Sequence, residues 1–464
     1  MNISRISPKC LFLLAAALFT ALPLFPAGGD AGSGLDPDTT QTILAEVADL
    51  MARRKYPEAL ALFDQINQTG SANRELELLR ASLLNSAGRT ADARAIASGI
   101  LSREPDNIDA LLVLAASAAA EGKDREQRTT LERVIKIDPK NTKALSDLGY
   151  IAIRAQSLRT AGAYFDRALA SDGNYGEALV GRAIVYRYAQ DPKKSEQLLN
   201  KAVRLNPQWA MPLNERARLY KGAGFLEDAL GDLDAAKKLE PDNYWIAADR
   251  GAVLVELNRK PEALEEFNRA ISLEPNNFLA YVYRAGIKDE AGDYAGAEQD
   301  YLVLMKLKPE YYFASEGLGF IRMRNQQWAG ARDAFLAAYK QSPREYCYAL
   351  LATINWMRAG RATDPKQFLA QVLRTAPRES VEWYMLKLYH DLSGDNDMAV
   401  RIDSEKNLDA KSRMLFYLAN YYDIRGKKNL ADNYFLQVRE MNRVSTIEWR
   451  INEWMIDERG LRGL

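Results

Sequence analysis

Large apolar side chains recur along most of the chain with a spacing of thirty-four residues, and small residues recur in step with them. The large side chains lie eight residues before a repeated proline position, at Leu131, Phe165, Leu199, Leu233, Phe267, Tyr301, Phe335 and Leu369. Alanine recurs twelve residues before it, at Ala93, Ala161, Ala229, Ala263, Ala297 and Ala331, with Ser195, Gln127 and Pro365 at the remaining positions. Stacked helical hairpins require such regularity because each hairpin buries its apolar face only against its neighbours. The pattern therefore predicts closely packed helix pairs repeated along the chain.

Turn residues follow the same period. The prolines are Pro105, Pro139, Pro207, Pro241, Pro275, Pro309, Pro343 and Pro377, with Gly173 at the vacant position. Proline cannot continue the second helix of a pair. The first helix should end where glycine or asparagine recurs, at Gly88, Gly122, Gly224, Asn258, Gly292, Gly360 and Gly394, because these residues accept the left-handed conformation of a helix end. Asparagines suited to cap the next helix follow four prolines, at Asn107, Asn141, Asn243 and Asn277.

This order of small residue, alanine, large apolar residue, alanine and proline resembles the tetratricopeptide repeat. The resemblance covers about nine units in register over residues 74–379. Weaker units fit at 40–73, at 380–411 and in a last unit marked by Ala419 and Phe435. The resemblance implies an all-α, right-handed superhelical α-solenoid of about ten to twelve helix hairpins, closed by a C-terminal capping helix.

The C-terminal residues are consistent with such a cap. Ser445 and Glu448 have the spacing of a capping box. An apolar stripe follows on a helix that should end near Arg459, formed by Ile447, Ile451, Trp454 and Met455. A cap is needed because the last repeat of a solenoid otherwise exposes its stacking face. We therefore assign residues 39–445 to the solenoid and 446–464 to the capping helix and tail.

Residues 1–29 have the order of a secretory signal peptide. Arg5 and Lys9 precede an apolar run over 10–25, and small residues follow it. This run is interrupted by Thr20 and Pro23 and is short for a membrane span of roughly twenty residues, which favours cleavage over an uncleaved anchor. Residues 30–38 have the composition of a flexible linker. We expect an exported chain, periplasmic or extracellular in a bacterial envelope, with membrane association only through an uncleaved N-terminal segment.

In the family that the chain resembles, the first helix of each hairpin lines an inner groove. Carried over to this sequence, the groove residues are polar toward the N-terminal side and apolar toward the C-terminal side: Arg154, Arg187, Asn214, Arg218, Trp245, Leu279, Val282, Phe313, Phe320, Met323, Leu350, Ile354 and Met357. A protein or peptide partner with an apolar helix or extended segment flanked by acidic residues would suit both stretches. Alternatively, the repeats fill part of their own groove with these side chains.

Arginine forms a further column, at Arg182, Arg216, Arg250 and Arg284. One interpretation is a basic ladder for an anionic ligand. The other is pairing of each arginine with carboxylates of the adjacent unit, such as those around Asp232, Asp234 and Glu266. We favour pairing, because an arginine repeated beside a helix crossing is placed to reach the neighbouring unit.

Composition adds few chemical candidates. The 62 basic residues balance the 62 acidic residues, so bulk electrostatics give no reason to expect nucleic-acid binding. The single histidine, His390, occupies the position of Tyr186 and Tyr220 in other units, which favours a packing role. Cys347 is the one cysteine outside the leader and is expected to pack as a small apolar residue. Without a phosphate loop, a two-histidine site or a cysteine–zinc pattern, we predict no catalytic residue, cofactor or metal site.

These patterns together predict an exported, non-enzymatic scaffold or adaptor that holds protein partners along its groove in envelope assembly or maintenance. Two alternatives use the same fold: a ligand- or solute-binding periplasmic component, and a membrane-tethered assembly factor. A small molecule retained in a cavity would favour the ligand role, and a stoichiometric protein partner would favour the adaptor.

Overall fold

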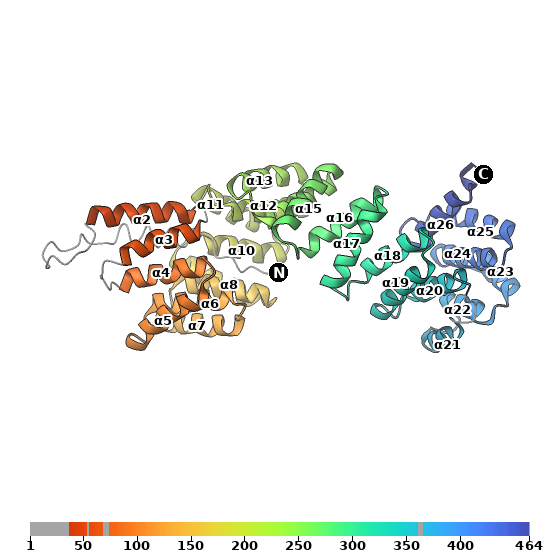
Figure 1. Ribbon diagram of the computed structural model, residues 1–464, viewed down its shortest axis with the longest axis horizontal. Helices are drawn as coiled ribbons and strands as arrows, with labels where there is room; N and C mark the ends of the chain where they lie inside the picture. Colours follow the sequence, from red (N-terminus) through yellow and green to blue (C-terminus); the bar gives the residue numbers. More distant parts are fainter. Residues whose placement is uncertain (1–36, 53–54, 68–73, 361–364, 464) are drawn as a thin grey trace. The chain divides into compact units, whose positions relative to one another are not determined.

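The computed structural model describes residues 37–52, 55–67, 74–360 and 365–463. Within these ranges the chain forms α-helices and one short 3-10 helix, with no strand, and successive helices pair as hairpins (Figure 1). The all-α repeat fold predicted from the thirty-four-residue period is confirmed. The predicted leader at 1–29 and residues 30–36 of the predicted linker lie outside the described residues.

The chain divides into two compact units, of which unit 1 ends at Pro241 and unit 2 begins at Asp242. The described helices of unit 1 form six hairpins: α2 (Pro37–Ala52) with α3 (Tyr56–Asn67), α4 (Arg74–Ser86) with α5 (Thr90–Arg103), α6 (Ile108–Ala120) with α7 (Asp124–Ile137), α8 (Thr142–Arg154) with α9 (Leu158–Ser171), α10 (Gly176–Tyr188) with α11 (Pro192–Leu205), and α12 (Ala210–Gly222) with α13 (Leu226–Leu239).

The described part of unit 2 contains six more hairpins and a terminal helix. They are α14 (Tyr244–Glu256) with α15 (Lys260–Leu273), α16 (Phe278–Glu290) with α17 (Tyr294–Leu307), α18 (Tyr312–Arg324) with α19 (Trp328–Gln341), α20 (Tyr346–Arg358) with α21 (Pro365–Thr375), α22 (Val381–Asp391) with α23 (Asp395–Ser404), α24 (Leu408–Ile424) with α25 (Lys428–Met441), and then α26 (Ile447–Glu458) and η1 (Leu461–Gly463).

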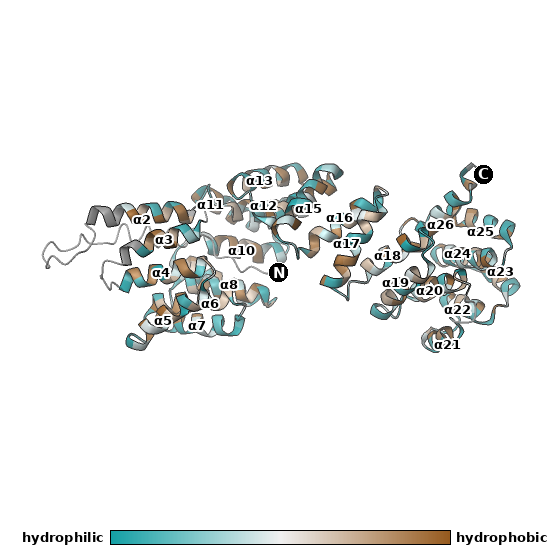
Figure 2. Cartoon of the chain, viewed as in Figure 1, coloured by the Kyte–Doolittle hydropathy of each residue, from teal (hydrophilic) through white to brown (hydrophobic). Residues whose placement is uncertain are grey.

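The hairpin of α14 and α15 shows how the period produces the local structure. The side chain of Asn243 accepts a hydrogen bond from the backbone N–H of Trp245 at 3.0 Å and begins α14. Asn258 takes a left-handed φ of 57° in the turn between the helices. On α15, Ala263, Phe267 and Ala270 are buried at a spacing of three and four residues, which places them on one face. Figure 2 shows apolar and polar residues on different faces of individual helices.

The large apolar side chain of each period matches the small residue that it meets. Gly149, Gly251 and Gly319 lie against the rings of Phe165, Phe267 and Phe335, where an added Cβ would approach a ring carbon to 2.6–2.7 Å. Where the large side chain is a leucine, the same column holds alanine: Leu131 with Ala115, Leu199 with Ala183, and Leu233 with Ala217. A fully buried Phe of this kind contributes about 1.5–3 kcal/mol through removal of its surface from water.

Left-handed residues end the first helices, as the glycine column predicts. Gly88, Gly122, Gly224, Gly292 and Gly360 all have positive φ. Three glutamines take the same conformation where glycine is missing from the column, at Gln156, Gln190 and Gln326. In the later hairpin of α22 and α23 the left-handed residue that closes the first helix is Leu392, and Gly394 instead precedes α23.

The predicted C-terminal helix is present as α26, but its cap differs from the predicted one. The side chain of Thr446 accepts a hydrogen bond from the N–H of Trp449 at 3.2 Å, because the helix begins at Ile447. Ser445 is therefore not the capping residue. Glu448 is buried and accepts a hydrogen bond from the Tyr417 hydroxyl at 2.9 Å, so its side chain faces the core of unit 2.

Candidate functional site

The arginine column binds carboxylates of the chain itself. Arg216 donates from Nε and Nη2 to the two oxygens of Asp232, each at 2.7 Å, and from Nη1 to Asn200 at 2.7 Å. Arg284 makes the same contacts one hairpin pair later: with Asp300 at 2.9 and 2.6 Å and with Asn268 at 2.7 Å. The other two pairs are Arg182 with Asp166 and Arg250 with Glu266. The predicted pairing is confirmed, and each guanidinium group already has a carboxylate partner.

The polar groove residues of unit 1 are engaged in a similar way. Arg187 and Arg218 both bind Glu215, at 3.2 and 2.5 Å, and Glu215 is buried. Arg154 pairs with Asp124 at 2.9 Å. The sequence analysis did not single out Glu215, whose charge is shared by two of the three arginines. This stretch consequently offers less positive charge to an acidic partner than the sequence suggests.

Six of the predicted groove residues are buried: Asn214 in unit 1, and Phe320, Met323, Leu350, Ile354 and Met357 in unit 2. The five apolar side chains belong to a buried cluster that includes residues of α24 and α26. Arg358 on α20 donates to Asp423 on α24 at 2.8 Å, which joins these two helices directly. The C-terminal helices thus fill this stretch of the predicted groove. We correct the assignment accordingly: these five residues form core and not an open binding surface.

Four predicted groove residues keep accessible surface in unit 2: Trp245, Leu279, Val282 and Phe313. Phe313 is 50% exposed and Leu279 is 42% exposed, although both are large and apolar. Val282 and Phe313 line a cavity of about 300 Å³ between α16 and α18, which we call the aromatic pocket. Its other lining residues are Gly286, Tyr301, Leu304, Tyr311, Glu316, Gly317 and Arg450.

Glu316 supplies a carboxylate to the aromatic pocket. Its Oε2 accepts a hydrogen bond from the Tyr348 hydroxyl at 2.5 Å. In the described part of the chain, no lysine or arginine forms an ion pair with this carboxylate. Burial raises the pKa of Glu316 above its ordinary value, since water is removed from the charged form. The sequence analysis gave no signal for Glu316 because its neighbours in the period are not acidic.

Arg450 reaches the same pocket from α26. Its Nη2 donates to one oxygen of Asp289, and the Tyr301 hydroxyl donates to the other at 2.8 Å. The guanidinium carbon lies 3.8 Å from the centroid of the Phe320 ring, which is a cation–π arrangement. Because Arg450 and Asp289 are 161 residues apart, this contact ties the end of unit 2 to α16.

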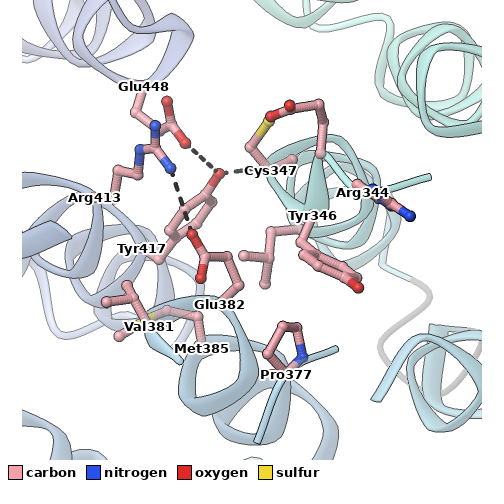
Figure 3. Close-up of a pocket in the computed structure, with 12 residues that line it drawn as sticks. Arg344, Tyr346, Cys347, Pro377, Val381, Glu382, Met385, Arg413, Tyr417 and Glu448 are labelled. Carbon is pink, nitrogen blue, oxygen red and sulfur yellow. Dashed lines mark hydrogen bonds and ion pairs between the residues drawn. The ribbon is translucent and has the colours of Figure 1, made fainter. Parts of the chain in front are cut away.

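A second cavity, of about 240 Å³, lies among α20, α22, α24 and α26 (Figure 3). We call it the charged pocket. Tyr417 donates a hydrogen bond to Glu448 at 2.9 Å, and Arg413 pairs with Glu382 at 3.4 Å. The other lining residues are Arg344, Glu345, Tyr346, Cys347, Leu350, Pro377, Val381 and Met385.

Burial dominates the ionisable groups of the charged pocket. The pKa of Glu448 is raised by loss of hydration, while the nearby Arg413 charge and the Tyr417 hydrogen bond act in the opposite direction. Burial also raises the pKa of the Cys347 thiol. A protonated thiol is a poor nucleophile, and Cys347 packs against the apolar core of unit 2. This placement agrees with its predicted role as a packed apolar residue.

The described residues bring together no group of three or more His, Cys, Asp or Glu side chains that could hold a metal ion. His390 is partly exposed, and its Nδ1 lies 2.7 Å from Oδ1 of the adjacent Asp391. None of the described helices combines the length and the apolar character needed to cross a membrane. The two pockets of unit 2 are therefore the features on which a binding function can be argued.

Comparison with known sequences agrees with the period and the hairpins. A sequence model of the tetratricopeptide repeat matches residues 146–210, 214–278 and 249–312. The chain is a tetratricopeptide repeat protein. The matched ranges include the helices that carry the arginine column and most of α16, where the aromatic pocket begins. No curated protein sequence matches this tetratricopeptide repeat protein.

Solved structures share the fold. The crystal structure of the APC/C hetero-tetramer Cut9–Hcn1 is 16% identical, with a TM-score of 0.54 over 68% of this chain and 63% of that chain. PilF of Pseudomonas aeruginosa is 19% identical and covers 45% of this chain and 94% of its own, with a TM-score of 0.41. PilW, a widely conserved type IV pilus biogenesis factor, is 19% identical and covers 46% of this chain and 97% of its own, with a TM-score of 0.36.

Proposed function

We propose that this tetratricopeptide repeat protein is a non-enzymatic scaffold that binds a protein partner at the aromatic pocket of unit 2. The observation that carries the proposal is the exposure of Phe313 and Leu279 beside that cavity. Elsewhere in unit 2 the predicted groove residues of α18 and α20 are covered by the chain's own C-terminal helices. Large apolar side chains left exposed beside a cavity are typical of binding sites.

The proposal is tested by photo-crosslinking. A benzoylphenylalanine placed at Phe313 or Leu279 should crosslink to one discrete polypeptide in cells that express the full chain. Val400 on α23 provides the matched control, because it is an apolar residue that is 70% exposed and lies outside the pocket. Equal crosslinking from position 400, or none from positions 313 and 279, would refute the proposal.

A substitution separates binding from folding. Phe313→Ser should weaken capture of that polypeptide without changing the unfolding midpoint, because half of the ring is already in water. Val400→Ser is the control and should change neither. Loss of helical circular dichroism in Phe313→Ser would show that the ring supports the fold instead.

Export to a bacterial envelope, in a role in assembly or maintenance, is part of the same proposal and is supported by the residue order of the leader. Mass spectrometry of the N-terminus from fractionated cells distinguishes a processed exported chain from one anchored through an uncleaved leader. A chain found in the cytoplasm with residues 1–29 intact would contradict export.

The charged pocket favours a second candidate, which is the binding of a small polar molecule. Its cavity of about 240 Å³ is lined by both acidic and basic side chains, as Figure 3 shows. Native mass spectrometry of the purified chain tests this role. A retained mass that Glu382→Gln and Arg413→Met abolish would support it, and an unliganded mass from every preparation would count against it.

A further inference from the structure

We propose that the aromatic pocket binds a basic side chain, arginine or lysine, of the protein partner, and that Glu316 provides the opposite charge. This inference deepens the proposed function and rests on it. It names the anchor residue of the partner, which the exposed apolar surface alone does not.

The charges around the pocket do not balance. Asp289 is satisfied by Arg450 and by the Tyr301 hydroxyl. Glu316 accepts a hydrogen bond from Tyr348 and has no cationic partner among the described residues. A half-buried carboxylate without a cation loses hydration that nothing in the chain restores. A cation from another molecule would supply the missing interaction.

The walls of the pocket suit a cation. Tyr311 and Phe313 lie side by side, with ring centroids 5.6 Å apart, and Phe313 is on the same helix as Glu316, three residues away. Residues at this spacing share one face of a helix. Aromatic faces attract arginine and lysine through their quadrupole, most strongly where water is excluded. The cavity therefore offers ring faces and a carboxylate to one incoming group.

The chain already binds its own cations in this way on both sides of the cavity. Arg450 stacks on Phe320 while it donates to Asp289. Lys308 lies 5.5 Å from the ring centroid of Phe278, which itself contacts Tyr311. A volume of about 300 Å³ is at the lower limit for ligand pockets and is suited to one long side chain.

The test uses the full chain and short fluorescent alanine-rich peptides that differ at one central residue. That residue is arginine, lysine, citrulline or norleucine, and fluorescence anisotropy measures the affinity of each. Citrulline keeps the shape of arginine and removes its charge. We expect the arginine and lysine peptides to bind about tenfold or more tightly than the citrulline and norleucine peptides, as hydrogen bonds to charged groups require.

Three variants locate the effect. Glu316→Gln should weaken binding of the arginine peptide about tenfold to a hundredfold, so that it matches the citrulline peptide. Glu310→Gln should leave it unchanged, because Glu310 is exposed in the turn before α18 and does not line the pocket. Phe313→Leu keeps an apolar wall and removes the ring, so it should reduce the preference for arginine over citrulline even if Glu316→Gln fails to fold.

The outcomes separate this inference from the proposed function. Equal affinity for arginine and citrulline peptides, or no binding at about millimolar peptide, overturns the basic anchor. If Phe313→Ser still abolishes capture of the cellular partner, the scaffold function survives that result. If arginine methyl ester alone binds as tightly as the arginine peptide, with the same dependence on Glu316, the pocket is a small-cation site and the inference is wrong.

Discussion

Replacing Gly251 by alanine should overpack the hairpin of α14 and α15. The added Cβ would lie 2.7 Å from Cε1 and 2.8 Å from Cζ of Phe267, where ordinary contacts begin near 3.4 Å. The ring is completely buried, so it cannot turn into solvent. Overpacking of this kind costs about 1–3 kcal/mol. The better helix propensity of alanine returns about 0.8–1 kcal/mol of that cost.

Gly231→Ala is the matched control. Gly231 lies within α13 and is exposed, and a Cβ added there would meet no atom within 4 Å. This variant should gain about 0.8–1 kcal/mol from helix propensity alone. The two glycine-to-alanine variants should thus differ in free energy of unfolding by about 1–3 kcal/mol, which is the overpacking cost alone. Urea unfolding followed by circular dichroism measures both.

A double variant completes the experiment. Gly251→Ala combined with Phe267→Leu recreates the leucine and alanine pairing found in other periods, so leucine should relieve the clash and the two changes should couple favourably. Hydrogen exchange of α14 and α15 locates the effect. If Gly251→Ala is stabilised as much as Gly231→Ala, the ring does not oppose this glycine, and the packing described here is wrong.

Other contacts give equally direct predictions. Arg216→Met should lower the free energy of unfolding by about 1–3 kcal/mol, because it leaves Asp232 without its bidentate partner, and chemical unfolding checks this. Ser195→Ala should change stability by less than about 1 kcal/mol, since alanine is the usual residue of that column, and thermal unfolding checks it although the hydroxyl now donates to Ala183. Glu448→Gln should stabilise the chain increasingly as the pH rises above about 4.5: the unfolded carboxyl ionises there, whereas the buried one, whose pKa is raised, must ionise at higher pH at a cost in stability. Unfolding midpoints of both proteins at acidic and neutral pH test this, and a constant difference would contradict it.

The sequence was sufficient for features that repeat within one period. The alanine and large apolar columns, the asparagine caps and the arginine pairs each depend on neighbours a fixed number of residues away. The three left-handed glutamines show the same rule from the structural side, because the turn imposes the conformation even where glycine is absent. Local chemistry and spacing therefore predicted the hairpins.

The candidate site was predictable only in part. Phe313, Leu279 and Val282 follow from the position of the first helices, and the structure leaves them accessible. The burial of Phe320 and Met357 depends on α24 and α26, which contact them from far along the chain. The contact of Arg450 with Asp289 spans 161 residues and has no counterpart in any other period. A repeat pattern indicates which face a residue occupies and cannot indicate what covers that face.

The filling of unit 2 from α18 onward gives its binding surface a direction. Toward α14, Leu279 and Trp245 continue the accessible side beyond the aromatic pocket. Toward α20 the corresponding positions are occupied by the chain's own helices, and Arg450 forms a wall at that edge. A polypeptide held in the pocket can run on only along α16 and α14. Such a one-sided berth selects the end of a partner chain over the middle of a long, straight segment.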